Sequence, residues 1–439
     1  MVDYFERNGL LHPSHHGFRK GHNTTTALIE MIDKWSQAFD CGDISAVMAL
    51  DMSAAFDLVD KQLFLQKLQA YKVGDGVLGW VDSYLSNRSQ RVYIDGVLSD
   101  ELPVTVGVPQ GSILGPLFYI IFTSDLPQTI HSNHSAVIAE HSKTLCNDCG
   151  SLCCYADDST FTISGSDPQL ISEKLSAKYK EISHFMRNNR LILNSDKTWV
   201  LIMASEHRHK KHNDFGIQLN TGNEIIHPVQ SEVLLGVTLS NNFQWNHHIR
   251  DGEQPLIRSL NRRNTALKRI SRISDFKTRK MIGSGLIMST ISYAIQLYGG
   301  CSGYLIDALQ VQQNVAMRHI TKLPFLTSTK TLLQQCDWLS VRQMIMYFSL
   351  LLLHKALVRK RPEYINEKVR AVTVRRETRT TDRLKLETTL YKTLTASKSY
   401  IPRTIDQWNS LPIYLREIKD IVYFKKALRE YIVNTIPVK

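Results

Sequence analysis

The chain has 439 residues, of which 43% are apolar, so it is long enough for two or three domains with sizeable cores. Its net charge of +12 is spread unevenly. Residues 1–249 carry 19 basic and 27 acidic side chains, whereas residues 250–439 carry 34 basic and 14 acidic ones. This division predicts catalytic or metal-binding carboxylates in the first half and a nucleic-acid-binding surface in the second.

The cysteine content and the hydropathy argue against a secreted, disulfide-rich protein and against a membrane protein. Seven cysteines are too few for a disulfide framework in a chain this long, and the first 20 residues lack the apolar core of a signal peptide. Both features predict an intracellular protein of the nucleus and cytoplasm. Residues 281–306 are uncharged and long enough to span a membrane, but their many Gly, Ser and Thr residues favour a buried helix and no membrane partner.

The first half alternates helical and strand patterns, which predicts an α+β fold. A polar cap at 23–26 opens an apolar-periodic helix that extends to Phe39, and a short apolar run at 44–50 predicts a buried strand that ends at Asp51. The further predicted elements are helices at 60–71 and 76–85, a hairpin at 91–96, a helix at 113–122, a helix at 168–189 and a strand pair at 191–205. Beyond 234–237 the pattern becomes helical and basic, and Arg258, Arg262 and Arg263 belong to a candidate phosphate-binding surface.

A polar stretch from His131 to Ser151 contains Cys146 and Cys149 at a metal-knuckle spacing. A zinc site that combines these two cysteines with Cys153 or Cys154 and a histidine is one hypothesis. Ordinary thiols are the alternative, because no second, separate Cys/His pair completes the pattern.

Two adjacent aspartates, Asp157 and Asp158, follow an apolar run and precede a β-rich polar run, which places them at a turn between two strands. Adjacent carboxylates repel each other, so the pair is a poor structural choice unless a divalent cation lies between them. By itself such a pair is more often a solvated turn. Together with Asp51 it provides the carboxylates from separate strands that phosphoryl transfer with two Mg²⁺ ions, or Mn²⁺, requires.

Three further residues fit the same chemistry. The ring of Phe56 near a sugar excludes a 2′-hydroxyl and selects deoxynucleotides. Gln110, in a Gly/Pro turn, allows backbone and amide to approach nucleotide and template, and Lys197 is a flexible cation for the leaving phosphates.

These motifs, in this order, resemble those of non-LTR (LINE-type, jockey/CR1-like) retrotransposon reverse transcriptases. The resemblance rests on Asp51-Met-Ser-Ala-Ala-Phe56-Asp57, Gly107-Val-Pro-Gln-Gly-Ser-Ile-Leu-Gly-Pro116, Tyr155-Ala-Asp-Asp158 and Leu193-Asn-Ser-Asp-Lys197-Thr. Weaker similarities lie at 17–26, 235–237 and 408–412.

The resemblance implies a right-hand polymerase with a palm, an antiparallel sheet with helices. The implied domains are partial fingers at 1–40, palm and fingers at 41–228 with a cysteine-rich insertion at 131–154, a helical thumb at 229–299, and a basic, mainly helical region at 300–439. The implied catalytic set is Asp51, Asp157, Asp158 and Lys197; Phe56, Gln110, Gly111, Tyr155 and Arg19 form the implied nucleotide-binding set. The implied partners are an RNA template, a DNA primer or target, and dNTPs.

Because most of the fingers region and the endonuclease of the family are missing, the sequence also fits an N-terminally truncated, inactive nucleic-acid-binding remnant. An RNA-directed RNA polymerase shares the metal chemistry, but Phe56 argues against it. The sequence does not specify the oligomeric state.

Overall fold

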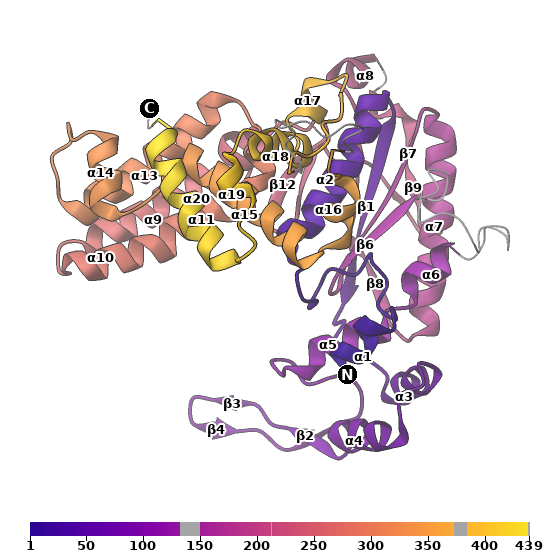
Figure 1. Ribbon diagram of the computed structural model, residues 1–439. Coiled ribbons are helices and arrows are strands. Elements are labelled where there is room, and N and C mark those ends of the chain that lie inside the picture. Colours follow the sequence, from indigo (N-terminus) through magenta and orange to yellow (C-terminus); the bar gives the residue numbers. More distant parts are fainter. Residues whose placement is uncertain (132–149, 212, 373–383, 438–439) are drawn as a thin grey trace. The chain divides into compact units, whose positions relative to one another are not determined.

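The computed structural model describes residues 1–131, 150–211, 213–372 and 384–437, so Cys146 and Cys149 of the zinc hypothesis lie outside the described residues (Figure 1). Two compact units emerge, each built from separated segments. The first comprises Met1–Asn23, Ile44–Ile202 and His209–Val229, and the second comprises Thr24–Asp43, Met203–Arg208 and Gln230–Lys439. The domain boundaries expected from the sequence stay predictions.

The first unit is built on a four-stranded sheet in the order β6-β7-β1-β8. Its strands are β1 (Ile44–Ser53), β6 (Ser151–Tyr155), β7 (Asp158–Gly165) and β8 (Ile192–Met203). The β1–β7 and β6–β7 pairs are antiparallel. Strand β1 is buried from Ile44 to Leu50, which explains its continuous apolar sequence.

Helices and short hairpins complete the first unit. The helices are α1 (Val2–Arg7), α3 (Lys61–Ala70), α4 (Asp75–Leu85), α5 (Leu114–Phe122), α6 (Leu126–His131), α7 (Pro168–Asn188) and the 3-10 turn η1 (Asn213–Gly216). The short strands are β2 (Arg88–Gln90), β3 (Tyr93–Ile94), β4 (Val97–Leu98), β5 (Leu102–Val104), β9 (Leu219–Asn220) and β10 (Ile225–Ile226). Helix α7 packs on β1 and β7, and it begins at Asp167, whose carboxylate accepts hydrogen bonds from the backbone N–H groups of Gln169 and Leu170.

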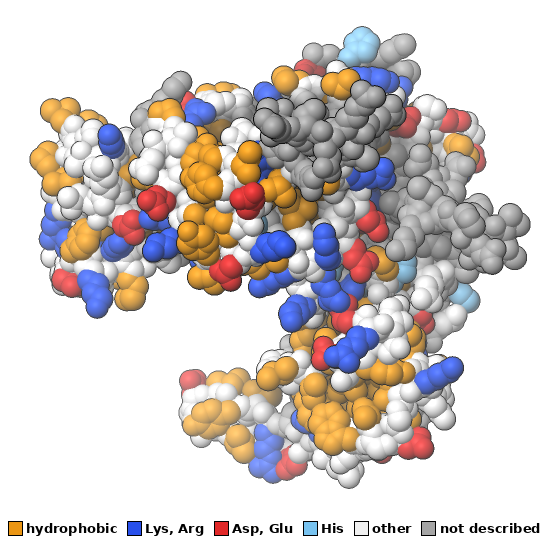
Figure 2. All heavy atoms as spheres, viewed as in Figure 1, with side chains coloured by type: hydrophobic (Ala, Val, Ile, Leu, Met, Phe, Trp, Pro, Cys, Tyr) orange, Lys and Arg blue, Asp and Glu red, His pale blue; other side chains and the backbone are white. Residues whose placement is uncertain are grey.

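The predicted hairpin at 91–96 is confirmed as β3 and β4, with Asp95 and Gly96 both at positive φ. Figure 1 shows this hairpin projecting away from α3 and α4, and Figure 2 shows hydrophobic side chains over it. Val92, Tyr93, Ile94, Val97 and Leu98 are each more than half exposed.

The predicted strand pair at 191–205 is wrong, because this segment forms one long strand, β8. The polar residues Asn194, Ser195 and Asp196 suggested a turn. They instead lie in the solvent-accessible first half of the strand, and its second half is buried from Val200 to Met203. The local composition therefore predicted a break in the strand, but pairing with β1 keeps the segment as one strand.

The second unit is mainly helical. The elements are α2 (Thr24–Cys41), β11 (Ser231–Leu234), β12 (Val237–Ser240), η2 (His247–Asp251), α9 (Leu256–Ile270), α10 (Phe276–Gly283), η3 (Ser284–Met288), α11 (Ser289–Ser292), α12 (Ile295–Tyr298), α13 (Gly303–Thr321), α14 (Thr329–Cys336), α15 (Val341–Arg359), α16 (Glu363–Lys368), α17 (Leu394–Ser397), α18 (Tyr400–Asn409), α19 (Ile413–Arg416) and α20 (Ile421–Thr435). Helix α8 (Glu206–Lys211) lies where the chain passes between the units.

The single buried helix expected at 281–306 is wrong, because the chain breaks into α10, η3, α11 and α12 before α13 begins. The break after α11 occurs where Tyr293 is extended and Ala294 is left-handed. In the part of the chain that the structure describes, one helix, α15, is long and apolar enough to cross a membrane. Two thirds of its apolar window (67%) is buried inside the unit, as in the core helix of a soluble protein.

Gly17 is required by a close approach of two backbone segments. The N–H of Cys154 donates to the Ser14 carbonyl, and the N–H of His16 donates to the Cys154 carbonyl, both at 2.8 Å. These bonds bring the 14–17 segment against β6, where a Cβ on Gly17 would lie 2.5 Å from the backbone nitrogen of Ala156.

We therefore expect Gly17→Ala to lower the free energy of unfolding by about 1–3 kcal/mol, because neither backbone segment yields easily. The matched control is Gly79→Ala within α4, where a Cβ meets nothing within 4 Å. It should gain up to about 1 kcal/mol from helix propensity. Urea unfolding of both variants checks this, and a Gly17→Ala midpoint equal to that of the wild type would contradict the close approach.

Candidate active site

The three candidate aspartates meet at one end of the four-stranded sheet. In the β6–β7 hairpin Tyr155 pairs with Asp158, so Ala156 and Asp157 form a two-residue turn, with Ala156 at a φ of 56°. In the β1–β7 pair the register ends with Leu50 opposite Ser159. One further step of this register places Asp51 opposite Asp158, on the same face of the sheet.

The electrostatics agree with this placement. Partial desolvation, followed by the negative charges of Asp157 and Asp51, raises the pKa of Asp158 from its ordinary value of 3.8 to about 6, although the side chain still faces solvent. The three carboxylates therefore interact unfavourably as folded. Lys197 on β8 lies beside them, with its Nζ 3.5 Å from Oδ2 of Asp51.

Tyr119, which the sequence analysis missed, connects this carboxylate cluster to the rest of the site. It is fully buried on α5, and its hydroxyl donates to the sulfur of Met52 at 2.8 Å. Burial and the nearby charge of Asp157 raise the pKa of Tyr119 well above its ordinary value. The ring of Phe56 packs on it with a centroid distance of 5.0 Å, so Phe56 is held at the edge of the cluster.

The Gly/Pro turn is tied to the segment that carries Phe56. The N–H of Val108 donates to the Phe56 carbonyl, and the N–H of Gly107 donates to the Val59 carbonyl, both at 2.9 Å. Gly107 has a φ of 90°, and a Cβ on it would lie 2.8 Å from the Asp57 carbonyl oxygen. Only glycine suits this position.

Gln110 does not present a free amide. Its Nε2 lies 2.8 Å from both carboxylate oxygens of Asp57, so this hydrogen bond fixes the turn. The sequence alone did not indicate this role of Asp57. Gly111 is exposed at a φ of 75°, with open space beside it, and Tyr155 is half-buried at the end of β6.

The Arg19 side chain is enclosed by protein groups and does not face a nucleotide site as the sequence predicted. Its guanidinium forms a bidentate ion pair with Glu6 at 2.9 and 3.0 Å and donates to the carbonyls of His12 and His15, and its side chain is 7% exposed. These bonds occupy its donors, so we leave Arg19 out of the proposed nucleotide site.

Carboxylate oxygens are the donors that Mg²⁺ prefers, and the mutual repulsion of the cluster is what a divalent cation relieves. The residues present therefore fit such an ion by chemistry and charge. Within the described ranges, no three His, Cys, Asp or Glu side chains converge closely enough to form a ready-made metal site. Cys153 of the zinc hypothesis is buried in β6.

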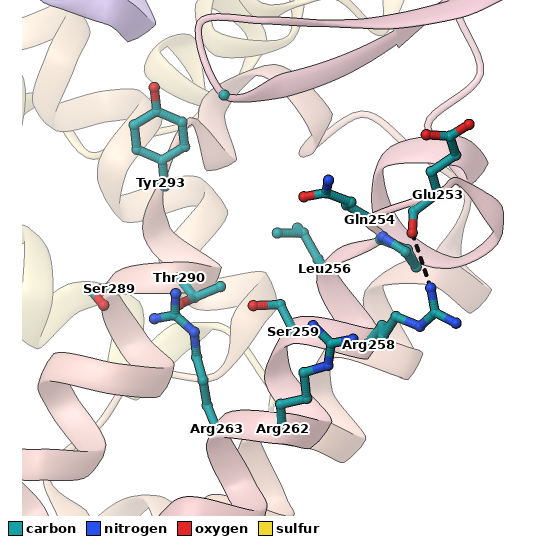
Figure 3. Close-up of a pocket in the computed structure, with 12 residues that line it drawn as sticks. Glu253, Gln254, Leu256, Arg258, Ser259, Arg262, Arg263, Ser289, Thr290 and Tyr293 are labelled. Atoms are coloured by element: carbon teal, nitrogen blue, oxygen red, sulfur yellow. Dashed lines mark hydrogen bonds between the residues drawn. The ribbon is translucent and has the colours of Figure 1, made fainter.

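The second unit contains a basic pocket of about 650 Å³. Figure 3 shows Arg258, Arg262 and Arg263 rising from α9 toward it, with Thr290 and Tyr293 on another side. Arg258 donates to the Glu253 carbonyl at 3.1 Å, and Arg263 donates to the Leu286 carbonyl at 3.0 Å, which orients both guanidiniums. Three cations with one acidic neighbour make this pocket suitable for phosphate groups.

The raised pKa of Asp158 predicts a pH-dependent stability. As the pH rises from about 4 to 6, the unfolded chain loses this proton before the folded one, so ionisation destabilises the fold and the penalty is complete above about pH 7. We expect Asp158→Asn to be more stable than the wild type by about 1 kcal/mol at pH 8, after allowance for solvent, and equal at pH 4.

Urea unfolding in EDTA at both pH values measures the difference, with Asp100→Asn near the exposed hairpin as control. Added Mg²⁺ should stabilise the wild type more than Asp158→Asn at pH 8. Equal stabilities at pH 8 would contradict the raised pKa of Asp158.

Comparison with known proteins agrees with the resemblance to reverse transcriptases found in the sequence. Residues 2–239 match the family model described as reverse transcriptase (RNA-dependent DNA polymerase). In Drosophila melanogaster, the probable RNA-directed DNA polymerase from transposon BS is 25% identical over 355 residues, which cover 79% of this chain and 36% of the relative. The RNA-directed DNA polymerase from mobile element jockey is 24% identical over 320 residues, 72% of this chain and 32% of the relative. The chain thus spans about a third of the length of these relatives.

A telomerase structure from Candida tropicalis, in complex with a fragment of telomeric RNA, aligns with 100% of this chain and 56% of its own at 12% identity and a TM-score of 0.41. Members of the matched family generally use divalent metal ions such as Mg²⁺. The family model covers more than half of the chain and includes Asp51, Gln110 and the Asp157-Asp158 hairpin. The chain belongs to the reverse transcriptase family.

Proposed function

We propose that this chain is an RNA-directed DNA polymerase that extends a DNA 3′-end on an RNA template with deoxynucleoside triphosphates. The observation that carries the proposal is the meeting of Asp51 with the Asp157-Asp158 hairpin at one end of the sheet, where partial desolvation and then the charges of Asp157 and Asp51 raise the pKa of Asp158 to about 6. A carboxylate cluster of this kind has a chemical use when cations bind to it.

In this proposal Asp51 and Asp157 hold two Mg²⁺ ions, and Asp158 adds negative charge beside them. The bound ions supply the positive charge that activates the 3′-hydroxyl and stabilises the pyrophosphate leaving group. Lys197 is 67% exposed and only weakly paired with Asp51, so its side chain is free to reach the leaving phosphates.

Phe56 selects the sugar. Its ring is half-buried against Tyr119, and its carbonyl accepts the Val108 N–H, so its position is fixed from two sides. A planar ring held in this way occupies the space that a 2′-hydroxyl needs. Gln110, whose Nε2 is bound to Asp57, keeps the adjacent turn in place.

The basic pocket on α9 supports a nucleic-acid partner, and it equally fits a second candidate function, that of a protein that binds nucleic acid without catalysis. The arginines of that pocket would neutralise backbone phosphates in either case. Primer extension and binding, measured on the same preparations, separate the two functions.

Asp157→Asn should reduce extension of oligo(dT) on poly(rA) with dTTP and Mg²⁺ by about 100-fold or more, because it removes a carboxylate that holds the ions. Binding of the primer–template should be retained. The matched control is Asp196→Asn, an exposed aspartate on β8, which should keep activity within about twofold.

Arg262→Glu provides the reciprocal control, since it should weaken binding and reduce the salt dependence of the affinity by about one to two released counterions. Extension that survives in Asp157→Asn would show that the site is wrongly assigned. Wild-type protein that binds the primer–template but never extends it would support the non-catalytic candidate.

Phe56→Val should increase incorporation of ribonucleotides relative to deoxynucleotides by about tenfold or more, because the smaller side chain leaves room for a 2′-hydroxyl. Single-nucleotide insertion of dTTP and UTP on the same primer–template measures this ratio. Tyr93→Val on the exposed β3–β4 hairpin is the control and should leave the ratio unchanged. An unchanged ratio in Phe56→Val would remove the role of this ring in sugar selection.

A further inference from the structure

Helix α4 has a buried face and an aromatic exposed face. Val81 and Leu85 are buried toward the unit core, whereas Trp80 is 51% exposed. A tryptophan carries a large apolar surface, and leaving half of it in water is costly unless a ligand uses it. Nothing in the proposed reaction assigns a role to this side chain.

Trp80 is held rigidly. Its ring stacks on Tyr84, with a centroid distance of 5.5 Å and an interplanar angle of 13°. Tyr84 contacts Phe118 of α5 edge to face at 6.0 Å, and Phe118 is fully buried. The guanidinium of Arg88 lies 4.5 Å from the centre of the Tyr84 ring, and its Nε donates to the Tyr84 carbonyl at 2.7 Å. The stack Trp80–Tyr84–Arg88 is therefore anchored in the core and carries a positive charge at one end.

The opposite face of the indole is open. Helical side chains lean toward the helix N-terminus, so Tyr84 covers one face of Trp80 and the turn at Gly76 lies beyond the other. Gly76 and Gly79 have no side chains there, and a Cβ at either position would meet nothing within 4 Å. The surface at Gly76 carries no side chain and therefore leaves room for a flat ligand against this face of Trp80, beside the exposed Val77.

The cation at the stack favours a negatively charged ligand. Three of the five basic residues of 61–91 are paired with carboxylates (Lys61 with Asp82, Lys67 with Asp125 and Arg91 with Glu101), so the positive charge beside the stack comes from Arg88. A flat aromatic group on a negatively charged chain describes a nucleobase of a single strand, for which an aromatic platform with a nearby cation is the usual binding element.

We propose that the Trp80–Tyr84–Arg88 stack is a binding site for an unpaired base of single-stranded nucleic acid. The identification of this strand as the unpaired RNA template rests on the proposed function. The stacking itself does not, because it requires neither bound ions nor polymerisation.

Fluorescence anisotropy with a labelled oligo(rA) at fixed salt tests the site. Trp80→Ala should weaken binding about tenfold, since one stacked base contributes about 1–3 kcal/mol. The affinity of Trp80→Phe should lie between those of the wild type and Trp80→Ala. Gly76→Leu should also weaken binding severalfold by covering the open face, even though leucine favours the helix. Leu170→Ala, at an exposed apolar position on α7, is the matched control and should bind as the wild type does.

Two further readouts identify stacking. The salt dependence of binding should be unchanged in Trp80→Ala, because no phosphate contact is lost. A phosphodiester oligomer of the same length without bases should bind wild type and Trp80→Ala equally. Urea unfolding of Gly76→Leu and Trp80→Ala shows whether each variant is folded, and a folded Gly76→Leu is sufficient for the test.

Unchanged oligo(rA) affinity in folded Gly76→Leu and Trp80→Ala would overturn the proposal. So would an equal loss of affinity for the base-free oligomer. These outcomes differ from failure of the proposed function: absent primer extension leaves the stacking effect intact, whereas active extension without a stacking effect removes only this site.

Discussion

Repulsion among Asp51, Asp157 and Asp158 is the constraint on which the first unit depends. Three carboxylates at one sheet edge disfavour the fold, and the pKa of Asp158 is raised first by partial desolvation and then by the charges of Asp157 and Asp51. The surrounding structure therefore has to hold the turn that carries two of them. It does so with the β1–β7 register, with the backbone bonds between Cys154 and the 14–16 segment, and with the contact of Gly17 on Ala156.

The same cost explains why the cluster lies at the end of the sheet instead of within it. Strand β1 is buried up to Leu50 and becomes partly accessible at Asp51, so the carboxylates appear where water still reaches them. A fully buried position would penalise the charged forms of the carboxylates and favour the protonated ones. A fully exposed position would weaken their mutual interaction and hence their affinity for a cation.

Sequence was sufficient for the elements and residues whose signal is local. The run at 44–50, the Asp-Asp turn and the Asp95-Gly96 hairpin each carry their pattern within a few residues, and all three are confirmed. Partners of long polar side chains could not be found in this way. Gln110 is bound by Asp57, 53 residues away, and Arg19 is bound by Glu6, so spacing alone did not show that both are occupied.

The errors in secondary structure have a related cause. At 192–196 polar residues suggested a turn, but pairing along β1 maintains one strand. At 281–306 an uncharged composition suggested one helix, but the left-handed Ala294 and the packing of several short helices divide it. The composition of a segment indicates whether it is buried. Whether the segment forms one continuous strand or helix depends on contacts with residues that are distant in sequence.

Helix α5 connects the parts of the first unit that recognition and chemistry would use. Successive residues of a helix point about 100° apart, so Phe118 and Tyr119 serve different neighbours. Phe118 packs on Phe64 at 4.9 Å and supports Tyr84 beneath Trp80, whereas Tyr119 supports Phe56 beside the carboxylates. A shift of α5 would displace the stacking platform and the sugar-selecting ring together. Under both proposals, the buried apolar sequence of α5 would therefore set the spacing between the stacked base and the selected sugar, in addition to stabilising the unit.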